Sequence, residues 1–572
     1  AISSVKPISD LSLSLGDTDD AMRLTEARAL LDGRGWYDLV EPRLNPPEGL
    51  HSHWSRLVDG PIAALVALGR ALFGPSGGDT LARIAWPLLL FAGTAFVLIR
   101  VAQTLGEGAA GWAAAMLIAT CWLLWMQFTP GNLDHHGIEL LLMAGMMLCA
   151  LDFTGKGRAA LMGVLAGVAL AIAYESLPII VWSGGLAVYY FVFAWNGVRA
   201  ARMFGLALTA STALCFIVQT PPSWWTNSAC DALALNGVGA ALIAGLGLAA
   251  ATKWAAASGK RRVISSLAIG AAAALAFIAP HPSCLHGPYG DLDPRLVPLW
   301  LNNVGEAQPL LARLGPEPVL TISAALLPLG ALVAALVLIV RGERRAGFRT
   351  LTALLALTSA IGIIQVRGFV LASAAAIPLA AMMLARIRFA TTLQPATIGI
   401  ALGLLVSPLV TQLALGAALP PPVRANEAKA TFNQAACFTN EAFADLRDLP
   451  PGVVLADLDA GPHIIAQTWH SAVAAPYQRI DKAMLKSLLV FGQPPREAAD
   501  IVRETGATYI ALCKTGVFAA NARPNTLAEH LASGHPPSWA TMLPASKGDY
   551  FLFRVERNRL PSTDEIRGRE EI

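Results

Sequence analysis

Residues 131–139 read Gly-Asn-Leu-Asp-His-His-Gly-Ile-Glu, and they lie where one long apolar segment, 109–128, ends and the next, 137–153, begins. Ionisable side chains are costly at the edge of a bilayer, so a cluster of acids and histidines there indicates a functional site. Carboxylate oxygens and an imidazole are also ligands that a divalent cation takes in proteins. This stretch therefore predicts a membrane-spanning fold with a candidate metal site at the membrane edge.

The composition of the whole chain is that of a membrane protein. Hydrophobic residues make up 55% of the 572 residues and charged residues 14%, against about 45–50% and 25% in soluble domains. A helix of about 20 apolar residues crosses a bilayer core. About twelve such segments occur, at 81–100, 109–128, 137–153, 159–174, 177–195, 203–219, 232–252, 263–280, 319–340, 350–365, 369–385 and 396–416. The sequence therefore predicts a polytopic α-helical membrane protein.

The basic residues predict which ends of these segments face the cytoplasm. Cytoplasmic loops accumulate Lys and Arg, and every second connection is basic here, at 100, 156–158, 199–202, 253–262, 341–349 and 386–388. The acidic segments 17–20 and 134–136, the loop 281–318 and everything after about 417 then face outward. This loop bias accounts for the net charge of +3, so we expect no nucleic-acid partner.

We expect four regions along the chain: a first outward loop (1–80), a transmembrane domain (81–418), an outward, periplasmic α/β domain (419–558) and a charged tail (559–572). The periodicity in the α/β domain predicts strands at 453–457, 508–512 and 550–554, and helices at about 462–468, 482–490, 495–505 and 525–533. No apolar segment precedes the first acidic motif. Either the outward N-terminus is native or a preceding helix is missing from this sequence, and we favour the second interpretation.

Four of the seven cysteines lie in segments that are expected to face outward. An oxidising compartment permits disulfides, so Cys230–Cys284 and Cys437–Cys513 are candidate pairs. The other three cysteines fall inside apolar segments, where a small buried apolar residue is the simplest interpretation.

Gly16-Asp17-Thr18-Asp19-Asp20 is a second outward acidic segment. Two carboxylate segments far apart in sequence can share one metal ion if their loops meet, and a bound cation would neutralise a departing phosphate. Alternatively, Asp17, Asp19 and Asp20 cap the first surface helix, because Asp is favoured at a helix N-terminus. The sequence leaves both interpretations open.

Three outward motifs together resemble those of the oligosaccharyltransferase catalytic subunit, and the archaeal members most closely. They are Asp17-Thr18-Asp19, Asp134-His135-His136 and Asn303-Val304-Gly305-Glu306-Ala307-Gln308-Pro309. The resemblance covers the whole chain. It implies a GT-C membrane fold with about twelve visible crossings, or about thirteen if a helix precedes residue 1, and an outward C-terminal domain.

The resemblance also implies roles for the acidic and histidine residues. Asp19, Asp134 and His136 would hold a divalent cation, Mg²⁺ or Mn²⁺. Asp19 would also orient the acceptor or act as a base, with Asp17 as the first acidic position of the catalytic motif. Glu306 would reach the metal ion or the acceptor from the long outward loop.

A donor site is expected from a second group of outward residues. Arg367, just before an apolar segment, resembles the arginine that grips the lipid-linked pyrophosphate in this family. His51, His53 and Arg56, next to Trp54, form an aromatic and basic patch suited to a sugar face and a phosphate. The alternative for this patch is an interfacial aromatic anchor.

The acceptor motif departs from the family. Its Trp-Trp-Asp-Tyr-Gly motif has Asp457-Leu458-Asp459-Ala460-Gly461 as the best counterpart here, without the tryptophans and the tyrosine. A site that recognises a hydroxyl needs a hydrogen-bonding wall, so we expect a glycan or lipid acceptor instead of an asparagine sequon. Other candidates to line the acceptor site are Glu175, Asp459, His463, His470, Tyr477, Arg479 and Trp224-Trp225.

We interpret the chain as an enzyme, a GT-C glycosyltransferase that acts as a monomer in the bacterial inner membrane. Its donor would be a polyprenyl phosphate or pyrophosphate that carries a sugar, and its acceptor a periplasmic glycan or lipid. One alternative is a protein oligosaccharyltransferase acting on Asn. Another is a transporter of lipid-linked saccharides, because acids and histidines also line ion pathways, although no inverted repeat is detectable in the sequence. A scaffold protein would leave the acid-histidine motifs unexplained.

Overall fold

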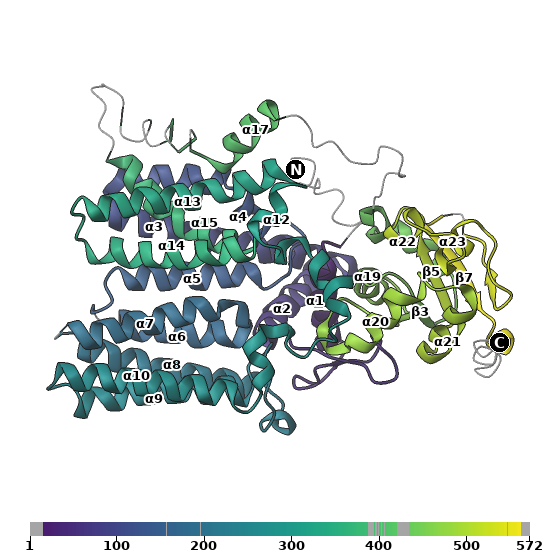
Figure 1. Ribbon diagram of the computed structural model, residues 1–572, viewed down its shortest axis with the longest axis horizontal. Coiled ribbons are helices and arrows are strands. Elements are labelled where there is room, and N and C mark those ends of the chain that lie inside the picture. Colours follow the sequence, from purple (N-terminus) through teal and green to yellow (C-terminus); the bar gives the residue numbers. More distant parts are fainter. Residues whose placement is uncertain are drawn as a thin grey trace.

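The computed structural model describes residues 15–561 apart from 156, 195, 387–393, 395–396, 398–399, 402, 405, 420–433 and 546. Long helices lie side by side in one part of the molecule, a domain containing a sheet lies at the other end, and α1 and α2 lie between them (Figure 1). The predicted fold class, a helical membrane protein with a C-terminal α/β region, is confirmed.

Among the described residues, eight helices are long and apolar enough to cross a membrane. Shorter apolar helices occur at four further predicted crossings. The main helices of this part are α3 (Pro75–Thr120), α5 (His136–Ala150), α6 (Arg158–Ile172), α7 (Leu177–Phe193), α8 (Gly197–Gln219), α9 (Leu235–Trp254), α10 (Gly259–Ile278), α13 (Pro318–Val340), α14 (Ala346–Ile364), α15 (Gly368–Ala385) and α17 (Pro408–Ala418). The helix α3 covers two predicted segments. The number of crossings and their orientation stay predictions.

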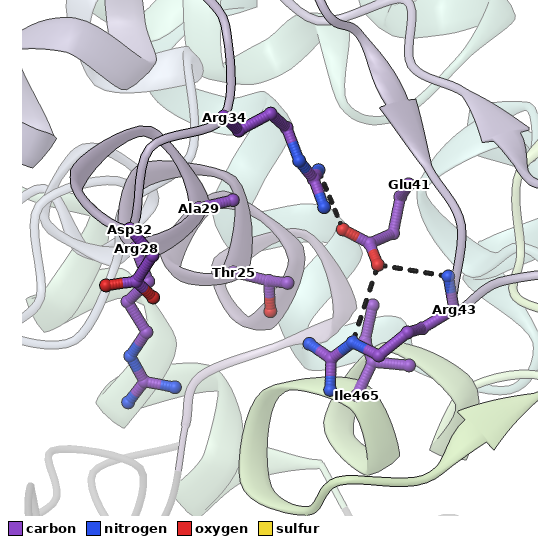
Figure 2. Close-up of a pocket in the computed structure, with 8 residues that line it drawn as sticks. All are labelled: Thr25, Arg28, Ala29, Asp32, Arg34, Glu41, Arg43 and Ile465. Carbon is purple, nitrogen blue, oxygen red and sulfur yellow. Dashed lines mark hydrogen bonds and ion pairs between the residues drawn. The ribbon is translucent and has the colours of Figure 1, made fainter.

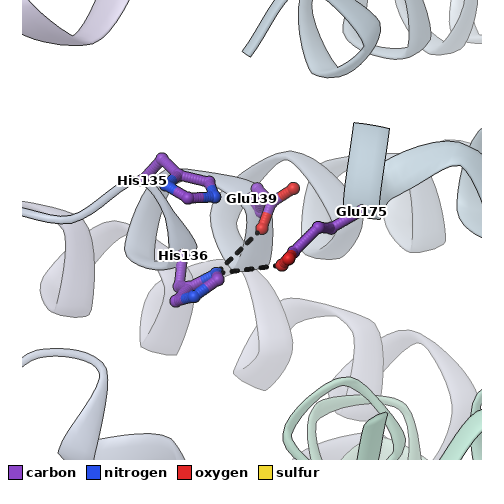
Figure 3. A group of neighbouring side chains, drawn as sticks. All are labelled: His135, His136, Glu139 and Glu175. Carbon is purple, nitrogen blue, oxygen red and sulfur yellow. Dashed lines mark hydrogen bonds and ion pairs between the residues drawn. The ribbon is translucent and has the colours of Figure 1, made fainter. Parts of the chain in front are cut away.

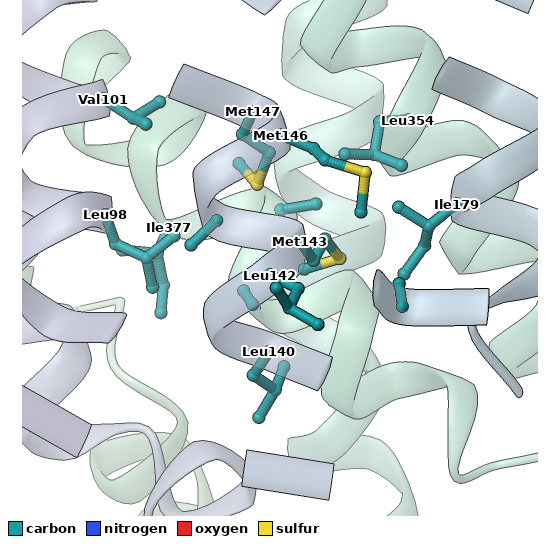
Figure 4. Packing of buried hydrophobic residues seen from close by; sticks show 14 of the residues in the cluster. Leu98, Val101, Leu140, Leu142, Met143, Met146, Met147, Ile179, Leu354 and Ile377 are labelled. Carbon is teal, nitrogen blue, oxygen red and sulfur yellow. The ribbon is translucent and has the colours of Figure 1, made fainter. Parts of the chain in front are cut away.

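The core between these helices consists of aliphatic and thioether side chains. Met143, Met146 and Met147 of α5 lie among Leu354 of α14 and Ile179 of α7 (Figure 4). Methionine is unbranched and fills irregular gaps, so three of them let α5 adapt to several neighbouring helices at once. This packing positions the N-terminal end of α5, which begins at the acid-histidine motif.

The first outward loop folds into α1 (Thr18–Leu31), β1 (Val40–Glu41), β2 (Leu50–His51) and α2 (Arg56–Phe73). A buried ion-pair network joins α1 to α2. Arg23 Nη1 lies 2.7 Å from Asp59 Oδ1, and Arg56 Nη1 lies 3.2 Å from Glu26 Oε2 and 3.1 Å from Asp59 Oδ2. Removing one member of such a network would leave a buried charge unpaired, so these contacts set the position of α1 on α2.

The C-terminal domain contains a five-stranded mixed sheet of order β4-β3-β5-β7-β6. The strand β3 is parallel to β4 and β5, whereas β7 is antiparallel to β5 and β6. The strands are β3 (Val453–Leu455), β4 (Ser471–Ala472), β5 (Tyr509–Cys513), β6 (Ala540–Met542) and β7 (Tyr550–Val555), and the helices over the four predicted positions are α19 (Ala460–Gln467), α20 (Asp481–Val490), α21 (Pro495–Thr505) and α23 (Leu527–Ala532).

The three predicted strands correspond to β3, β5 and β7, so these predictions are confirmed. Two strands, β4 and β6, were not predicted, because a strand of two or three residues is too short to show an alternating pattern. Both predicted disulfides, Cys230–Cys284 and Cys437–Cys513, are present.

The first outward loop docks onto the edge of this sheet. The Asn45 N–H donates to Ala472 O at 3.0 Å, and the Ala472 N–H donates to Arg43 O at 2.8 Å, so Leu44 pairs with the edge strand β4. The acidic motif at the start of α1 is thereby held beside the C-terminal domain. The limits of the four regions expected from the sequence stay a prediction.

Candidate active site

The two acidic segments, 17–20 and 134–136, meet at the N-terminus of α1. Asp20 Oδ1 accepts a hydrogen bond from the Leu133 N–H at 2.6 Å, across 113 residues of sequence. Asp17 is the N-cap of α1, where its Oδ1 accepts from the N–H groups of Asp19 and Asp20, each at 3.0 Å. The capping interpretation therefore holds for Asp17 and Asp20, and it leaves the Asp19 carboxylate outside the capping box.

Carboxyl groups crowd this end of α1. Burial raises the pKa of Asp19 well above its usual range, and the charges of Asp134 and Asp17 raise it further. Burial also acts to raise the pKa of Asp134, but the neighbouring His135 and His136 outweigh it and lower the pKa of that carboxyl. Carboxylates held this close repel one another, and a bound cation relieves that repulsion. The residues present therefore fit a divalent metal ion.

His136 lies between Asp134 and two glutamates. Its Nε2 is 3.1 Å from Asp134 Oδ2, and its Nδ1 is 3.2 Å from Glu139 Oε2 and 3.6 Å from Glu175 Oε2. Figure 3 shows His136 facing both glutamates, and His135, His136, Glu139 and Glu175 offer ligand atoms that all lie within 4.8 Å of one another.

Glu139 belongs to the motif that the sequence singled out, but it was given no role there. The spacing of His136 and Glu139 could have indicated that the two side chains meet, because residues three apart in a helix share one face.

The third motif is joined to the arginine expected to bind the donor. The Arg367 N–H donates to Glu306 O at 3.1 Å, and the Val366 N–H donates to Gln308 O at 2.9 Å. The Arg367 side chain reaches the acid-histidine cluster, since its Nη1 lies 2.7 Å from Glu175 Oε1. All three motifs and Arg367 therefore meet at one place.

A cavity of about 720 Å³ joins these groups. Its charged wall includes Asp19, His136, Glu139, Glu175, Glu306 and Arg367. Its apolar wall includes Leu140, Ile179, Leu320, Ala324, Val370 and Leu371, from α5, α7, α13 and α15. A pocket whose wall contains both charged and aliphatic side chains suits a ligand with an anionic head and an apolar tail.

Ten predicted residues do not line this cavity, and five of them are Asp134, Trp224, Trp225, His470 and Arg479. Arg56 is buried in the network with Glu26 and Asp59. His463 is fully buried, and its ring stacks on Phe438 with centroids 4.6 Å apart. The other three are His51, which stacks on the ring of Trp224 with centroids 3.7 Å apart, Asp17, which caps α1, and Asp459, whose pKa is raised by burial and by the charge of Asp17.

His53 does line the cavity, next to Trp54 and Tyr477. Burial lowers the pKa of His53 to about 3, so its ring is neutral near pH 7 and offers no positive charge to a phosphate. The Tyr477 hydroxyl donates to Thr18 O at 3.2 Å, which joins the C-terminal domain to the first turn of α1.

Some other residues of the cavity wall have no role predicted from the sequence, including Asp231, Tyr289, Arg313 and Glu317. Asp231 Oδ1 lies 2.6 Å from Arg479 Nη2. Its position beside Cys230, in a predicted outward loop, was the only signal for it in the sequence.

A smaller cavity of about 320 Å³ lies between α1, the β1 segment and α19, and it is lined by Thr25, Arg28, Ala29, Asp32, Arg34, Glu41, Arg43 and Ile465 (Figure 2). Arg34 and Arg43 both pair with Glu41. Arg34 Nη1 lies 2.9 Å from Glu41 Oε2, and Arg43 Nε lies 3.6 Å from Glu41 Oε1. Arg43 Nη1 also donates to Thr468 O at 3.1 Å, at the end of α19. Because cations at a helix C-terminus are stabilising, this contact of Arg43 helps to dock the C-terminal domain on the first loop.

Sequence comparison finds no match, either to a protein-family model or to a curated protein. Solved structures do match. The oligosaccharyltransferase AglB of Archaeoglobus fulgidus, in complex with an inhibitory peptide and a dolichol-phosphate, aligns with a TM-score of 0.58 and 13% identity over 96% of this chain and 72% of its own.

Two further structures of that archaeal enzyme agree. The enzyme tethered to an acceptor peptide containing the NVT sequon has a TM-score of 0.61 at 13% identity, over 96% of this chain and 71% of its own. The complex with Zn and sulfate has a TM-score of 0.56 at 13% identity, over 96% of this chain and 70% of its own. The chain therefore has the GT-C fold of an oligosaccharyltransferase catalytic subunit, as its motifs predicted.

Proposed function

We propose that this chain is a GT-C glycosyltransferase of the bacterial inner membrane, acting as a monomer with its C-terminal domain in the periplasm. It transfers a sugar or oligosaccharide from a polyprenyl phosphate or pyrophosphate to a periplasmic glycan or lipid. The observation that carries the proposal is the cavity, whose wall contains Arg367, members of the acid-histidine cluster and a group of aliphatic side chains. A polyprenyl phosphate has the same division into an anionic head and an apolar tail.

In the proposed site, Asp19, Asp134 and His136 hold a divalent cation, Mg²⁺ or Mn²⁺. When bound, this ion offsets the negative charge of the departing phosphate. Arg367 binds the same phosphate through its planar guanidinium, which presents two parallel N–H donors. Glu306, whose backbone carbonyl accepts from the Arg367 N–H, presents its carboxylate to the cavity.

The acceptor attacks through a hydroxyl oxygen. The bond from this oxygen to the anomeric carbon of the donor forms, and the bond from that carbon to the phosphate oxygen breaks with its electron pair on the phosphate. The hydroxyl proton passes to the Asp19 carboxylate, which lines the cavity.

The acceptor is the point where this chain and the family differ. Asp457-Leu458-Asp459-Ala460-Gly461 lacks the two tryptophans and the tyrosine, and the Asp457 side chain is buried. Without that wall, a sequon hydroxyl has no obvious partner, which favours a glycan or lipid acceptor. The alternative is transfer to Asn, which the AglB-like fold favours.

Purified protein in lipid nanodiscs, supplied with polyprenyl-linked sugar and Mn²⁺, tests both acceptors. An envelope glycan extract should be glycosylated, and an Asn-X-Thr peptide should not. Peptide glycosylation that depends on its Thr would establish the alternative.

The Arg367→Lys variant keeps the charge but loses the planar fork, so its KM for the donor should rise about tenfold or more. Arg295→Lys, at an exposed outward arginine, is the matched control.

A further inference from the structure

One carboxylate, that of Glu175, contacts both halves of the proposed site. Its Oε1 lies 2.7 Å from Arg367 Nη1, and its Oε2 lies 3.6 Å from His136 Nδ1. Glu175 therefore links the arginine that would bind the donor phosphate to the imidazole that would bind the cation. Its side chain lines the cavity and is 33% exposed, so a ligand in the cavity can reach it.

A phosphate and Glu175 compete for the same guanidinium. While Glu175 Oε1 occupies Nη1 of Arg367, that arginine cannot offer its full fork to an entering phosphate. When an entering phosphate displaces Glu175 from Arg367, the phosphate and the Glu175 carboxylate lie side by side near His136. Two such anions repel each other strongly where water is partly excluded. A cation bound beside His136 would relieve this repulsion.

We propose that Glu175 couples cation binding to donor-phosphate binding, holding Arg367 in a paired state until the cation site is filled. The inference rests on the proposed function, and it makes Glu175 a positioning residue in place of the acceptor contact expected from the sequence. Coupling of this kind is reciprocal, so the phosphate must tighten cation binding by the same factor by which the cation tightens phosphate binding.

The cavity contains a matched control for this role. Glu317 also lines the cavity and also pairs with an arginine, Arg313, but this pair joins α12 (Leu310–Leu314) to the N-cap of α13 and includes no residue of the acid-histidine cluster. Glu317→Gln removes one negative charge from the same cavity without touching the link between Arg367 and His136.

The experiment is a binding titration in nanodiscs with farnesyl phosphate and Mn²⁺ as the probes, each measured with and without the other by calorimetry. In the unaltered protein, Mn²⁺ should tighten farnesyl phosphate binding by about tenfold or more, within the usual range of coupling. In Glu175→Gln, farnesyl phosphate should bind without Mn²⁺ about fivefold tighter or more, and the coupling factor should fall to about a third or less. Glu317→Gln should keep the coupling factor.

An unchanged coupling factor in Glu175→Gln, or an equal loss in Glu317→Gln, would overturn the inference while leaving the donor site intact. A different result would show that the proposed function itself is wrong. If farnesyl phosphate does not bind, or binds equally well to the Arg367→Lys variant, the donor site itself is wrong and the inference falls with it.

Discussion

At the scale of single residues, the two ring nitrogens of His136 face different partners. Nε2 points toward Asp134, where the cation would lie, and Nδ1 points toward Glu139 at 3.2 Å. Glu139 is in turn held by the Ser176 hydroxyl, which donates to its Oε1 at 2.7 Å. A histidine that binds a metal ion generally donates its other N–H to a carboxylate, which sets the tautomer and the ring orientation. Glu139 is placed to do this for His136.

Glu139→Ala should therefore weaken Mn²⁺ binding by about 10–100-fold without abolishing it, the usual cost of losing such an outer partner. Asp134→Ala, which removes a proposed ligand, should abolish binding, and both are measured by calorimetry. Ser176→Ala should have a smaller effect than either. Loss of binding in Glu139→Ala with retention in Asp134→Ala would place the ion on the Nδ1 side of His136 instead.

A second residue-scale prediction concerns Asp457. Burial and the neighbouring Asp459 raise the pKa of Asp457 to about 7, against about 3.9 in an unfolded chain. The folded state then binds the extra proton, so this carboxyl stabilises the fold at low pH, and the contribution is lost as the pH rises from about 4 to about 7. Asp457→Asn should flatten the fall of Tm over that interval.

Asp457→Asn should reduce the pH dependence of the free energy of unfolding by at most about 1.4 kcal/mol per pH unit. Thermal unfolding at several pH values measures it, with Glu504→Gln as an exposed control. A variant whose Tm depends on pH as steeply as that of the unaltered protein would show that Asp457 is ionised in the folded state.

At the scale of elements, the start of α1 serves two purposes at once. The capping box of Asp17 and Asp20 satisfies backbone N–H groups, and the same turn presents Asp19 to the cavity. The helix N-terminus itself also favours negative charge. The two interpretations of the acidic motif are therefore compatible, with capping by Asp17 and a ligand role for Asp19.

This division of roles predicts different results for two substitutions of Asp17. Serine is also a good N-cap, so Asp17→Ser should keep the stability and the Mn²⁺ affinity, whereas Asp17→Ala should lose about 1 kcal/mol of stability. Thermal unfolding and calorimetry measure the two effects. Loss of Mn²⁺ binding in Asp17→Ser, with stability retained, would make Asp17 a metal ligand.

At the scale of the whole molecule, the site is completed only where separate regions meet. Asp231, in the loop before α9, binds Arg479 of the C-terminal domain through two contacts, Oδ1–Nη2 at 2.6 Å and Oδ2–Nε at 2.8 Å. Arg479 also donates to His51 O of the first loop at 3.2 Å. These contacts bring Tyr477 to the cavity wall beside Asp19.

Asp231→Ala should therefore loosen the C-terminal domain from the membrane part. It leaves the largely buried Arg479 without its carboxylate, at a cost on the order of 3 kcal/mol. Hydrogen exchange should rise over residues 470–480. The exposed Lys486–Glu504 pair offers a control, since Glu504→Ala should have a much smaller effect. Unchanged exchange over 470–480 in Asp231→Ala would show that other contacts hold the domain.

The sequence by itself determined the class of fold, the positions of the apolar helices and three of the five strands of the C-terminal sheet, and it named the two disulfide pairs as candidates. Hydropathy and strand alternation are local properties, so they can be recognised without knowing how the chain packs. The resemblance also identified the oligosaccharyltransferase-like fold. Of the residues named from it, Asp19, His136, Glu306 and Arg367 line one cavity, whereas Asp134 does not.

Only the tertiary structure decided which polar residues meet. Glu175 joins Arg367 across 192 residues, and Asp20 joins Leu133 across 113. Arg56 lies in a buried ion-pair network instead of the donor site, because α1 and α2 pack with their charged faces together. Such distances depend on how helices and loops pack over the whole molecule, and no pattern along the chain encodes them.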